Sequence, residues 1–296
     1  MKTALHTMGT PRLSVREAAE LAARVGFDGI EIIWDDDYYS ALRKDETESE
    51  LSTFLDLLES LHLQVACLTP YMTTINSPDI EERDRAIADF ERCIKVAARL
   101  RAGFIRVYGG GLFPNEETEV KRKKETLLLE SLAYLGDVAA QAGVTLAVET
   151  HFNTMTDTAS ETSRIVRNVD HPAVQVLYDQ PNLDFYGAEE YGDALSLLQG
   201  LIAYVHVKDF VFKEGVDGTF VSSHVANIDK SDRKIVSRVP GEGIVAWPEI
   251  LAGLKAQGYD GWLSFEYERR WYPEDLPEPE PGFSAGLRYI SSLLER

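Results

Sequence analysis

The sequence has little cysteine. Cys67 and Cys93 are the only two cysteines among 296 residues, and no CxxC spacing occurs. Two cysteines cannot form the disulfide framework that stabilises small secreted proteins. We therefore expect a protein whose thiols stay reduced, and a cytoplasmic location.

Long apolar runs are also missing. A membrane-spanning helix needs about 20 predominantly apolar residues in succession, and no segment of this chain provides them. Residues 1–13, which read MKTALHTMGTPRL, lack the long apolar core of a secretory signal. We expect no membrane partner.

Basic residues are scarce relative to acidic ones. The chain has 30 Lys and Arg against 49 Asp and Glu, which gives a net charge of −19. Nucleic-acid binding depends on basic side chains that neutralise phosphates. We therefore expect no nucleic-acid partner, whereas a small neutral or cationic ligand is compatible with this charge.

Hydrophobic residues make up 44% of the chain and charged residues 27%, as in a globular protein with a large core. Short runs rich in Val, Ile and Leu alternate with longer segments whose apolar residues recur every three or four positions, which is the helical period. We predict eight strands, each followed by a helical segment, at residues 3–8, 28–34, 64–71, 104–111, 144–151, 174–180, 202–210 and 261–268.

These strands read as apolar throughout, which is typical of a parallel sheet covered by helices. Eight such units close a barrel. We predict an α/β fold with a single domain, a (β/α)8 TIM barrel over residues 1–296, with a loop insertion at about 213–243. The alternative is an open doubly wound sheet with a second domain, but no linker precedes the Pro-rich segment 272–282, which we interpret as a loop before the last helix.

The active site of such a barrel lies at the C-terminal ends of its strands. Four residues that can bind a metal stand at the ends of the last four predicted strands: Glu149, Asp179, His206 and Glu266. A single carboxylate there is usually a helix cap or part of an ion pair. Three carboxylates close together would raise one another's pKa, and a divalent cation relieves that repulsion. The pattern therefore indicates a metal site.

Three carboxylates and one imidazole suit a hard or borderline divalent ion better than they suit structural zinc. We predict one divalent cation, with Mn²⁺ as the first choice and Mg²⁺, Co²⁺ or Zn²⁺ as alternatives. Further residues near the predicted strand ends are candidates for binding a substrate: His151, Asn182, Lys208, Asp209, Arg238, Trp34, Tyr108 and His6.

Each of these candidates has a structural alternative. Lys208 could face substrate oxygens and Asp209 could orient a ligand, or the two could form an ion pair that stabilises the loop after strand seven. His151 could point into the barrel mouth or satisfy a local hydrogen bond. Arg238 could bind a hydroxyl, carboxylate or phosphate group, or be a surface residue.

The aromatic candidates Trp34 and Tyr108, together with His6, lie near the ends of early strands. Aromatic faces at that position could form a wall against a sugar, and core packing would explain them equally well. The run Gly109–Gly111 lacks the Lys and Ser/Thr of a phosphate-binding loop. We interpret it as a turn after strand four.

The chain resembles the xylose-isomerase-like barrel superfamily, and within it the sugar (phosphate) isomerases and epimerases. The segments that carry this resemblance are GFDGIEI (26–32), LAVETH (146–151), LYDQPN (177–182), YVHVKD (204–209), VPGEGIVAWPEIL (239–251) and GWLSFEYE (261–268). They span essentially the whole chain. The HVKD and PGEG pair is specific to the superfamily but not to one reaction.

The resemblance implies a divalent cation held by Glu149, Asp179, His206 and Glu266. In related ketose 3-epimerases the two glutamates also move protons, so the resemblance implies Glu149 and Glu266 as the acid and the base. Some relatives have a His at the position of Asn182, and the Asn argues against a cluster of several metals. Enzymes of this group often form homodimers.

The first functional hypothesis is a metal-dependent isomerase or epimerase that acts on a small sugar or keto-polyol through an enediolate. The alternative is a metal-dependent dehydratase of the inosose or dehydroshikimate type, in which the same enediolate expels a β-hydroxyl group. An abasic-site DNA endonuclease is disfavoured by the acidic charge, and a non-catalytic sugar-binding barrel is the fourth hypothesis. We expect an unphosphorylated substrate.

Overall fold

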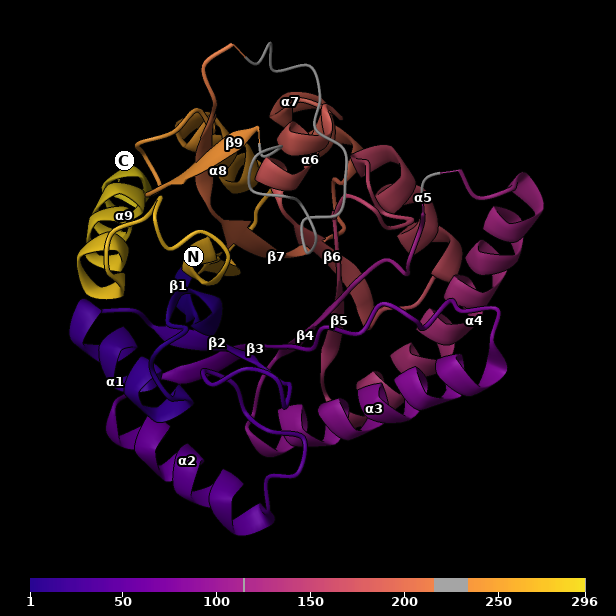
Figure 1. Ribbon diagram of the computed structural model, residues 1–296, viewed down its shortest axis with the longest axis horizontal. Helices are drawn as coiled ribbons and strands as arrows, with labels where there is room; N and C mark the ends of the chain where they lie inside the picture. Colours follow the sequence, from indigo (N-terminus) through magenta and orange to yellow (C-terminus); the bar gives the residue numbers. More distant parts are fainter. Residues whose placement is uncertain (114, 216–233, 296) are drawn as a thin grey trace.

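Eight parallel strands close into a barrel in the order β1-β10-β7-β6-β5-β4-β3-β2. The computed structural model describes residues 1–113, 115–215 and 234–295. Figure 1 shows the helices arranged around the strands, which is the architecture of a (β/α)8 TIM barrel. The predicted fold is thereby confirmed. None of the helices in the described part of the chain is both long enough and apolar enough to span a membrane.

All eight predicted strands occur, and each ends earlier than expected. Their bounds are β1 (Lys2–His6), β2 (Gly29–Ile33), β3 (Gln64–Thr69), β4 (Phe104–Val107), β5 (Thr145–Glu149), β6 (Val174–Tyr178), β7 (Ile202–Val207) and β10 (Trp262–Phe265). Strand β4 stops before the predicted turn at Gly109–Gly111. Gly110 has a φ of 70°, and a Cβ there would lie 2.5 Å from Cγ of Asn76, so only glycine fits this turn.

The helices begin and end where local capping chemistry favours it. They are α1 (Val15–Val25), α2 (Glu48–Ser60), α3 (Ile80–Arg99), α4 (Thr118–Ala142), α5 (Ala159–Val169), α6 (Gln180–Tyr186), α7 (Tyr191–Leu197), α8 (Trp247–Ala256) and α9 (Pro279–Leu294). Ser14 and Glu17 form a capping box at the start of α1, and Gly26 ends that helix with a φ of 100°.

Two helices differ from the sequence prediction. Helix α6 was not predicted; it starts directly after Asp179, whose carboxylate accepts a hydrogen bond from the backbone N–H of Asn182. Helix α9 begins at Pro279, so the interpretation of 272–282 as a loop was wrong for its last four residues. Proline is well tolerated in the first turn of a helix, because the N–H that it lacks has no partner there.

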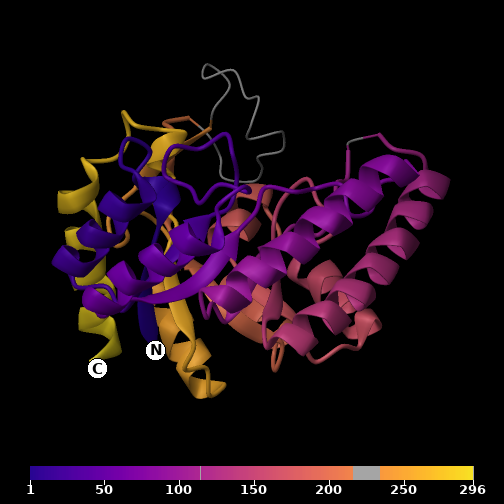
Figure 2. The same ribbon diagram turned by 90° about the horizontal axis from the view of Figure 1, so that it is seen from below.

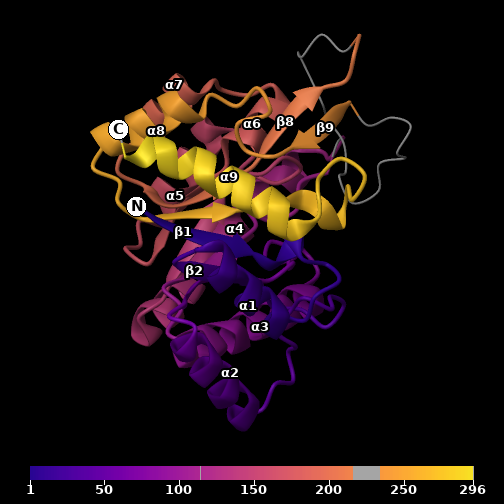
Figure 3. The same ribbon diagram turned by 90° about the vertical axis from the view of Figure 1, so that its left-hand side faces the viewer.

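The helices form a continuous outer layer. Figure 2 shows the two longest helices, α3 and α4, side by side on the outside of the barrel, where they contact each other. Figure 3 shows α9 between α1 and α8, so the last helix closes the ring against the first.

A two-stranded antiparallel ribbon forms between the residues just before the predicted insertion and a strand inside it. It consists of β8 (Asp209–Phe212) and β9 (Ile235–Arg238), with Phe210 opposite Ser237. Strand β8 follows directly from β7, so the ribbon stands at the C-terminal end of the barrel (Figure 3). Residues 216–233 of the predicted insertion at 213–243 lie outside the described residues.

Side chains on the strands alternate between the barrel interior and the helix layer. On β5, Leu146 and Val148 belong to the large core under the helices, whereas Ala147 belongs to a small separate cluster with Ala4, Leu177 and Tyr204. This alternation has a period of two residues. The residue that follows Ala147 on the same face is Glu149, so the interior face changes from apolar to polar toward the C-terminal end of the barrel.

The turn after β4 gives a test of this packing. A Cβ at Gly109 would lie 2.6 Å from Cγ2 of Thr156, which is closer than side chains tolerate. We expect Gly109→Ala to lower the free energy of unfolding by about 1–3 kcal/mol through overpacking. Urea denaturation measures this. Gly103→Ala is the control, because a Cβ there meets nothing within 4 Å. Equal stabilities of the two variants would contradict the packing.

Candidate active site

The structure brings the four predicted metal ligands together at the C-terminal end of the barrel. Nδ1 of His206 lies 3.3 Å from Oε1 of Glu149, 3.5 Å from Oδ2 of Asp179 and 3.6 Å from Oε2 of Glu266. All four ligand atoms lie within 4.8 Å of one another, and all four residues are buried. We call these four residues the ligand cluster.

The donor set fits a divalent cation. Nδ1 of His206 is buried, faces three carboxylates and forms no hydrogen bond with the described residues. Three carboxylate oxygens and one imidazole nitrogen are ligands that divalent ions accept. Burial lowers the pKa of His206, but Glu31 and Glu266 raise it well above its ordinary value, so a proton competes with a cation for Nδ1.

Glu31 on β2 orients the imidazole of His206, and the sequence interpretation missed it. Oε1 of Glu31 lies 3.2 Å from Nε2 of His206, so a proton on Nε2 leaves the lone pair of Nδ1 for a cation. Oε2 of Glu31 accepts a hydrogen bond of 2.9 Å from the hydroxyl of Tyr204, and Thr69 also donates to Glu31.

His6 lies beside Glu31 and His206, with 5.8 Å between the centroids of the two imidazole rings. Its Nδ1 accepts a hydrogen bond of 3.0 Å from the backbone N–H of Met8, so its Nε2 carries the proton and faces Oε1 of Glu31 at 3.5 Å. Burial raises the pKa of Glu31, but His206 and then His6 outweigh it and hold the pKa below its ordinary value. An ionised Glu31 therefore explains why the imidazoles of His6 and His206 both lie close to its carboxylate.

Arg106 on β4 fixes one carboxylate of the ligand cluster. Its Nε and Nη2 donate to Oε2 of Glu149 at 2.6 and 2.5 Å, which is a fork-like contact. The guanidinium also stacks on the ring of Tyr108, with 3.4 Å between its central carbon and the ring centroid. Burial raises the pKa of Glu149, but Arg106 more than compensates and keeps the pKa well below its usual range. Glu149 is thereby held as a carboxylate.

Lys208 places a cation against the opposite side of the ligand cluster. Its Nζ lies 2.7 Å from Oε2 of Glu266 and 2.9 Å from Oδ2 of Asp179, and it donates to Oδ1 of Asn182 at 2.9 Å. Burial lowers the pKa of Lys208, yet Asp179 and Glu266 raise it well above its ordinary value. Lys208 is therefore an ammonium. Asn182 also donates to Oε1 of Glu149, so it links both sides of the cluster.

The carboxylate of Asp209 points to a neighbouring loop. It accepts backbone hydrogen bonds from four residues between 2.9 and 3.1 Å: Phe210, Gly241, Gly243 and Val245. A Cβ at Gly243 would lie 2.5 Å from Cγ of Asp209, which explains the second glycine of the PGEG segment. Asp209 therefore anchors the loop that follows β9, and no ion pair joins it to Lys208.

The other candidates lie at different depths. Trp34 is fully buried in the core under the helices. Tyr108 and His151 meet edge to face at 4.9 Å beside Arg106 and Glu149, and Nδ1 of His151 lies 2.7 Å from the carbonyl of Phe152.

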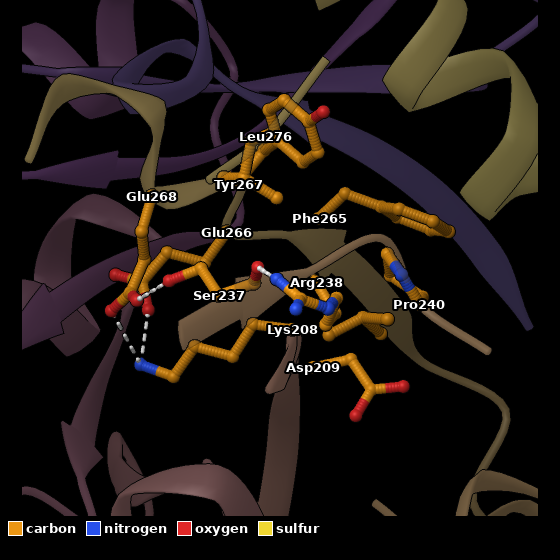
Figure 4. A pocket seen from close by; sticks show the side chains of 11 residues that line it. Lys208, Asp209, Ser237, Arg238, Pro240, Phe265, Glu266, Tyr267, Glu268 and Leu276 are labelled. Atoms are coloured by element: carbon orange, nitrogen blue, oxygen red, sulfur yellow. Dashed lines mark hydrogen bonds and ion pairs between the residues drawn. The ribbon is translucent and has the colours of Figure 1, made fainter. Parts of the chain in front are cut away.

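Arg238 on β9 lines a small cavity of about 10 Å³ together with Lys208, Glu266 and Glu268, as Figure 4 shows. The structure thus gathers Asn182, Lys208, Tyr108 and His151 around the ligand cluster, and separates Trp34 and Asp209 from it.

A sequence model described as "Xylose isomerase-like TIM barrel" matches residues 19–293. The chain belongs to the xylose isomerase-like TIM barrel family. Within this family, the chain is 30% identical to inosose dehydratase of Geobacillus thermodenitrificans over 151 residues, which are 48% of this chain and 47% of that protein. It is 28% identical to inosose dehydratase of Bacillus anthracis over 158 residues, 53% of this chain and 51% of the relative. The chain spans about half the length of these curated relatives.

Two solved structures of the family cover nearly the whole chain. A D-psicose 3-epimerase in the presence of D-fructose has a TM-score of 0.77 and 19% identity, and covers 100% of both chains. The IOLI protein with a bound zinc atom has a TM-score of 0.78 and 19% identity, and covers 100% of this chain and 98% of its own. At this identity the likeness shows the shared fold.

The role of Glu31 can be tested by metal binding. Glu31→Gln weakens the acceptor that orients His206, and changes to such outer partners lower metal affinity about 10- to 100-fold. We expect a loss of that size for Mn²⁺ in isothermal titration calorimetry. Glu59→Gln is the control, because Glu59 is an exposed residue of α2 that pairs with Arg101. An unchanged affinity in Glu31→Gln would contradict the orienting role.

The Arg106–Glu149 pair predicts a pH-dependent stability of the metal-free protein. Removing one partner of a buried pair costs about 3–5 kcal/mol, and we expect Arg106→Met to lose that much at pH 7. The pKa of Glu149 is depressed in the folded state, so the pair stabilises above the unfolded pKa of about 4.3. The deficit of the variant should therefore shrink as the pH falls below that value.

Denaturant unfolding in the presence of a chelator, between pH 3.5 and pH 7, measures this deficit. The double variant Arg106→Met/Glu149→Gln should recover part of the stability lost by Arg106→Met, because it leaves no unpaired buried charge. A deficit that is independent of pH, or a double variant no more stable than the single one, would contradict the assignment.

Proposed function

We propose that the protein is a metal-dependent dehydratase that removes water from a small keto-polyol of the inosose class. The observation that carries this proposal is the asymmetry of the ligand cluster. Arg106 holds Glu149 as a carboxylate on one side, and on the other side the ammonium of Lys208 lies 2.7 Å from Glu266. The names of the curated relatives support the same reaction.

A divalent cation bound by Glu149, Asp179, His206 and Glu266 would polarise a carbonyl group and stabilise the enediolate that forms when the adjacent carbon loses its proton. The four side chains supply the oxygen and nitrogen donors. The protein's other contribution is to keep this set buried and preorganised, through Glu31 behind His206 and Arg106 behind Glu149.

Glu266 and Lys208 form the proton-moving pair. The Glu266 carboxylate accepts the proton from the carbon next to the carbonyl group. The electron pair of the enediolate then expels the hydroxyl group on the β-carbon, and Lys208 gives that group a proton so that it leaves as water. The protonated Glu266 returns its proton to the neutral Lys208 across their 2.7 Å contact. The substrate loses one water and both side chains recover their starting states.

Epimerisation is the second candidate, because Glu149 and Glu266 both have an oxygen beside Nδ1 of His206. It requires a second group that returns a proton to the opposite face of the substrate. Glu149 is poorly suited to that task, because Nε and Nη2 of Arg106 both contact its Oε2 and a guanidinium does not release a proton. Dehydration needs no proton on Glu149.

The finer predictions stay predictions. These are Mn²⁺ as the bound ion, an unphosphorylated substrate, a homodimer, a cytoplasmic location and the absence of a nucleic-acid partner. Charge supports the unphosphorylated substrate, because the two buried cations of the site already pair with carboxylates.

Lys208→Met separates the two halves of the proposed reaction. The purified protein is loaded with Mn²⁺ and incubated with an inosose in deuterium oxide. We expect the wild type to release water, seen by mass spectrometry and as a new enone absorbance. Lys208→Met should lose about 100-fold or more in water release, because it lacks the acid, while exchange of the carbon-bound proton with solvent continues.

Metal affinity of Lys208→Met is measured in parallel, since Lys208 contacts two ligand residues. Formation of a deuterated epimer by the wild type, without release of water, would overturn the dehydratase proposal in favour of epimerisation. Water release by Lys208→Met at the wild-type rate, with metal bound, would overturn the role of Lys208.

A further inference from the structure

Lys208 has a third carboxylate neighbour, Glu268, which is not part of the ligand cluster. Glu268 is the first residue of the short 3-10 helix Glu268–Arg270 that follows β10. Its Oε1 lies 3.6 Å from Nζ of Lys208, and its side chain is only 13% exposed. Figure 4 shows Glu266 and Glu268 on the same side of the Lys208 ammonium.

The ribbon holds Glu268 in this position. Oε2 of Glu268 accepts a hydrogen bond of 3.2 Å from the hydroxyl of Ser237 on β9. Ser237 is itself fixed, because its backbone N–H donates to Oδ2 of Asp275 at 2.8 Å and it pairs with Phe210 on β8. A chain of contacts therefore runs from the ribbon through Glu268 to Lys208.

Lys208 is buried, and its Nζ has three closer partners: Oε2 of Glu266 at 2.7 Å, Oδ2 of Asp179 at 2.9 Å and Oδ1 of Asn182 at 2.9 Å. The cavity that Lys208, Ser237, Arg238 and Glu268 line has a volume of only about 10 Å³, roughly the space of one water molecule (Figure 4). A cation bound to the ligand cluster would also share the negative charge of Asp179 and Glu266. Glu268 is then the carboxylate neighbour of Lys208 whose charge no metal ion takes up.

We propose that Glu268 is a positioning residue that holds the Lys208 ammonium against Glu266, and that Ser237 of the ribbon holds Glu268 in turn. This proposal rests on the proposed function for the role of Lys208, but the contact itself does not depend on it. If so, Ser237, which lies on β9 within the predicted insertion, contributes to proton transfer through Glu268 and Lys208.

Three variants test this, with metal affinity, the rate of water release and crystal structures as readouts. Glu268→Ala removes the tether, and we expect kcat for water release to fall about 10- to 100-fold through misplacement of the acid. KM and Mn²⁺ affinity should change less than about threefold, because Glu268 is outside the ligand cluster. Glu268→Gln keeps an acceptor oxygen for Lys208, and its amide N–H can donate to the Ser237 hydroxyl, so it should restore part of the rate.

Glu278→Gln is the matched control. Glu278 precedes α9 and pairs with Arg269 of the same 3-10 helix at 2.5 Å, so its loss perturbs the neighbouring loop without touching Lys208. We expect wild-type kcat for this variant. Crystal structures should show Nζ of Lys208 withdrawn from Glu266 in Glu268→Ala and unmoved in Glu278→Gln.

The outcomes separate the two proposals. If Lys208 withdraws from Glu266 in the Glu268→Ala structure but the wild-type protein releases no water, the positioning role is supported and the proposed function is overturned. A Glu268→Ala variant with wild-type kcat, or with Lys208 unmoved, overturns the positioning role. A loss of activity in Glu268→Ala that is fully explained by weaker Mn²⁺ binding also overturns it, because Glu268 would then act on the ligand cluster.

Discussion

The site depends on a concentration of buried negative charge at one end of the barrel. Four carboxylates, three in the ligand cluster (Glu149, Asp179 and Glu266) and that of Glu31 behind His206, are almost completely buried. Unpaired, each would cost several kcal/mol or more to bury as an ion. Two buried cations, Arg106 and Lys208, offset part of this charge, and a divalent ion would supply the remainder. A divalent ion at the centre would balance this charge, and in its absence the raised pKa of His206 indicates that a proton on the imidazole offsets part of it.

The fold creates this concentration through strand geometry. Parallel strands bring their C-terminal ends to the same rim, and the period of two residues turns every second side chain inward. Local hydrogen bonds then give the two oxygens of one carboxylate different partners. Oδ1 of Asp179 caps α6 by accepting from Asn182, while Oδ2 faces His206. Oε2 of Glu149 accepts from Arg106, while Oε1 faces the cluster.

The barrel and the clustering of Glu149, Asp179, His206 and Glu266 could be predicted because both follow from periodic patterns: eight strand–helix units, and polar side chains at strand ends. The same pattern could have revealed Glu31 and Arg106, which are charged residues inside otherwise apolar strands on the interior face. The tasks of Lys208, Glu268 and Asp209 could not be read from sequence, because they depend on how the ribbon and its loop return to the barrel rim. The glycine turn after β4 explains why that strand is shorter than expected, and the capping of α6 by Asp179, which was not predicted, explains why α6 follows β6 directly.

The most direct test of the account is anomalous diffraction from crystals soaked in Mn²⁺. The account expects one strong peak at the cluster, within about 2.0–2.3 Å of the ligand atoms, namely Nδ1 of His206 and one oxygen each of Glu149, Asp179 and Glu266. The absence of a peak there at saturating Mn²⁺, or a single peak elsewhere with the four side chains unchanged, would contradict it.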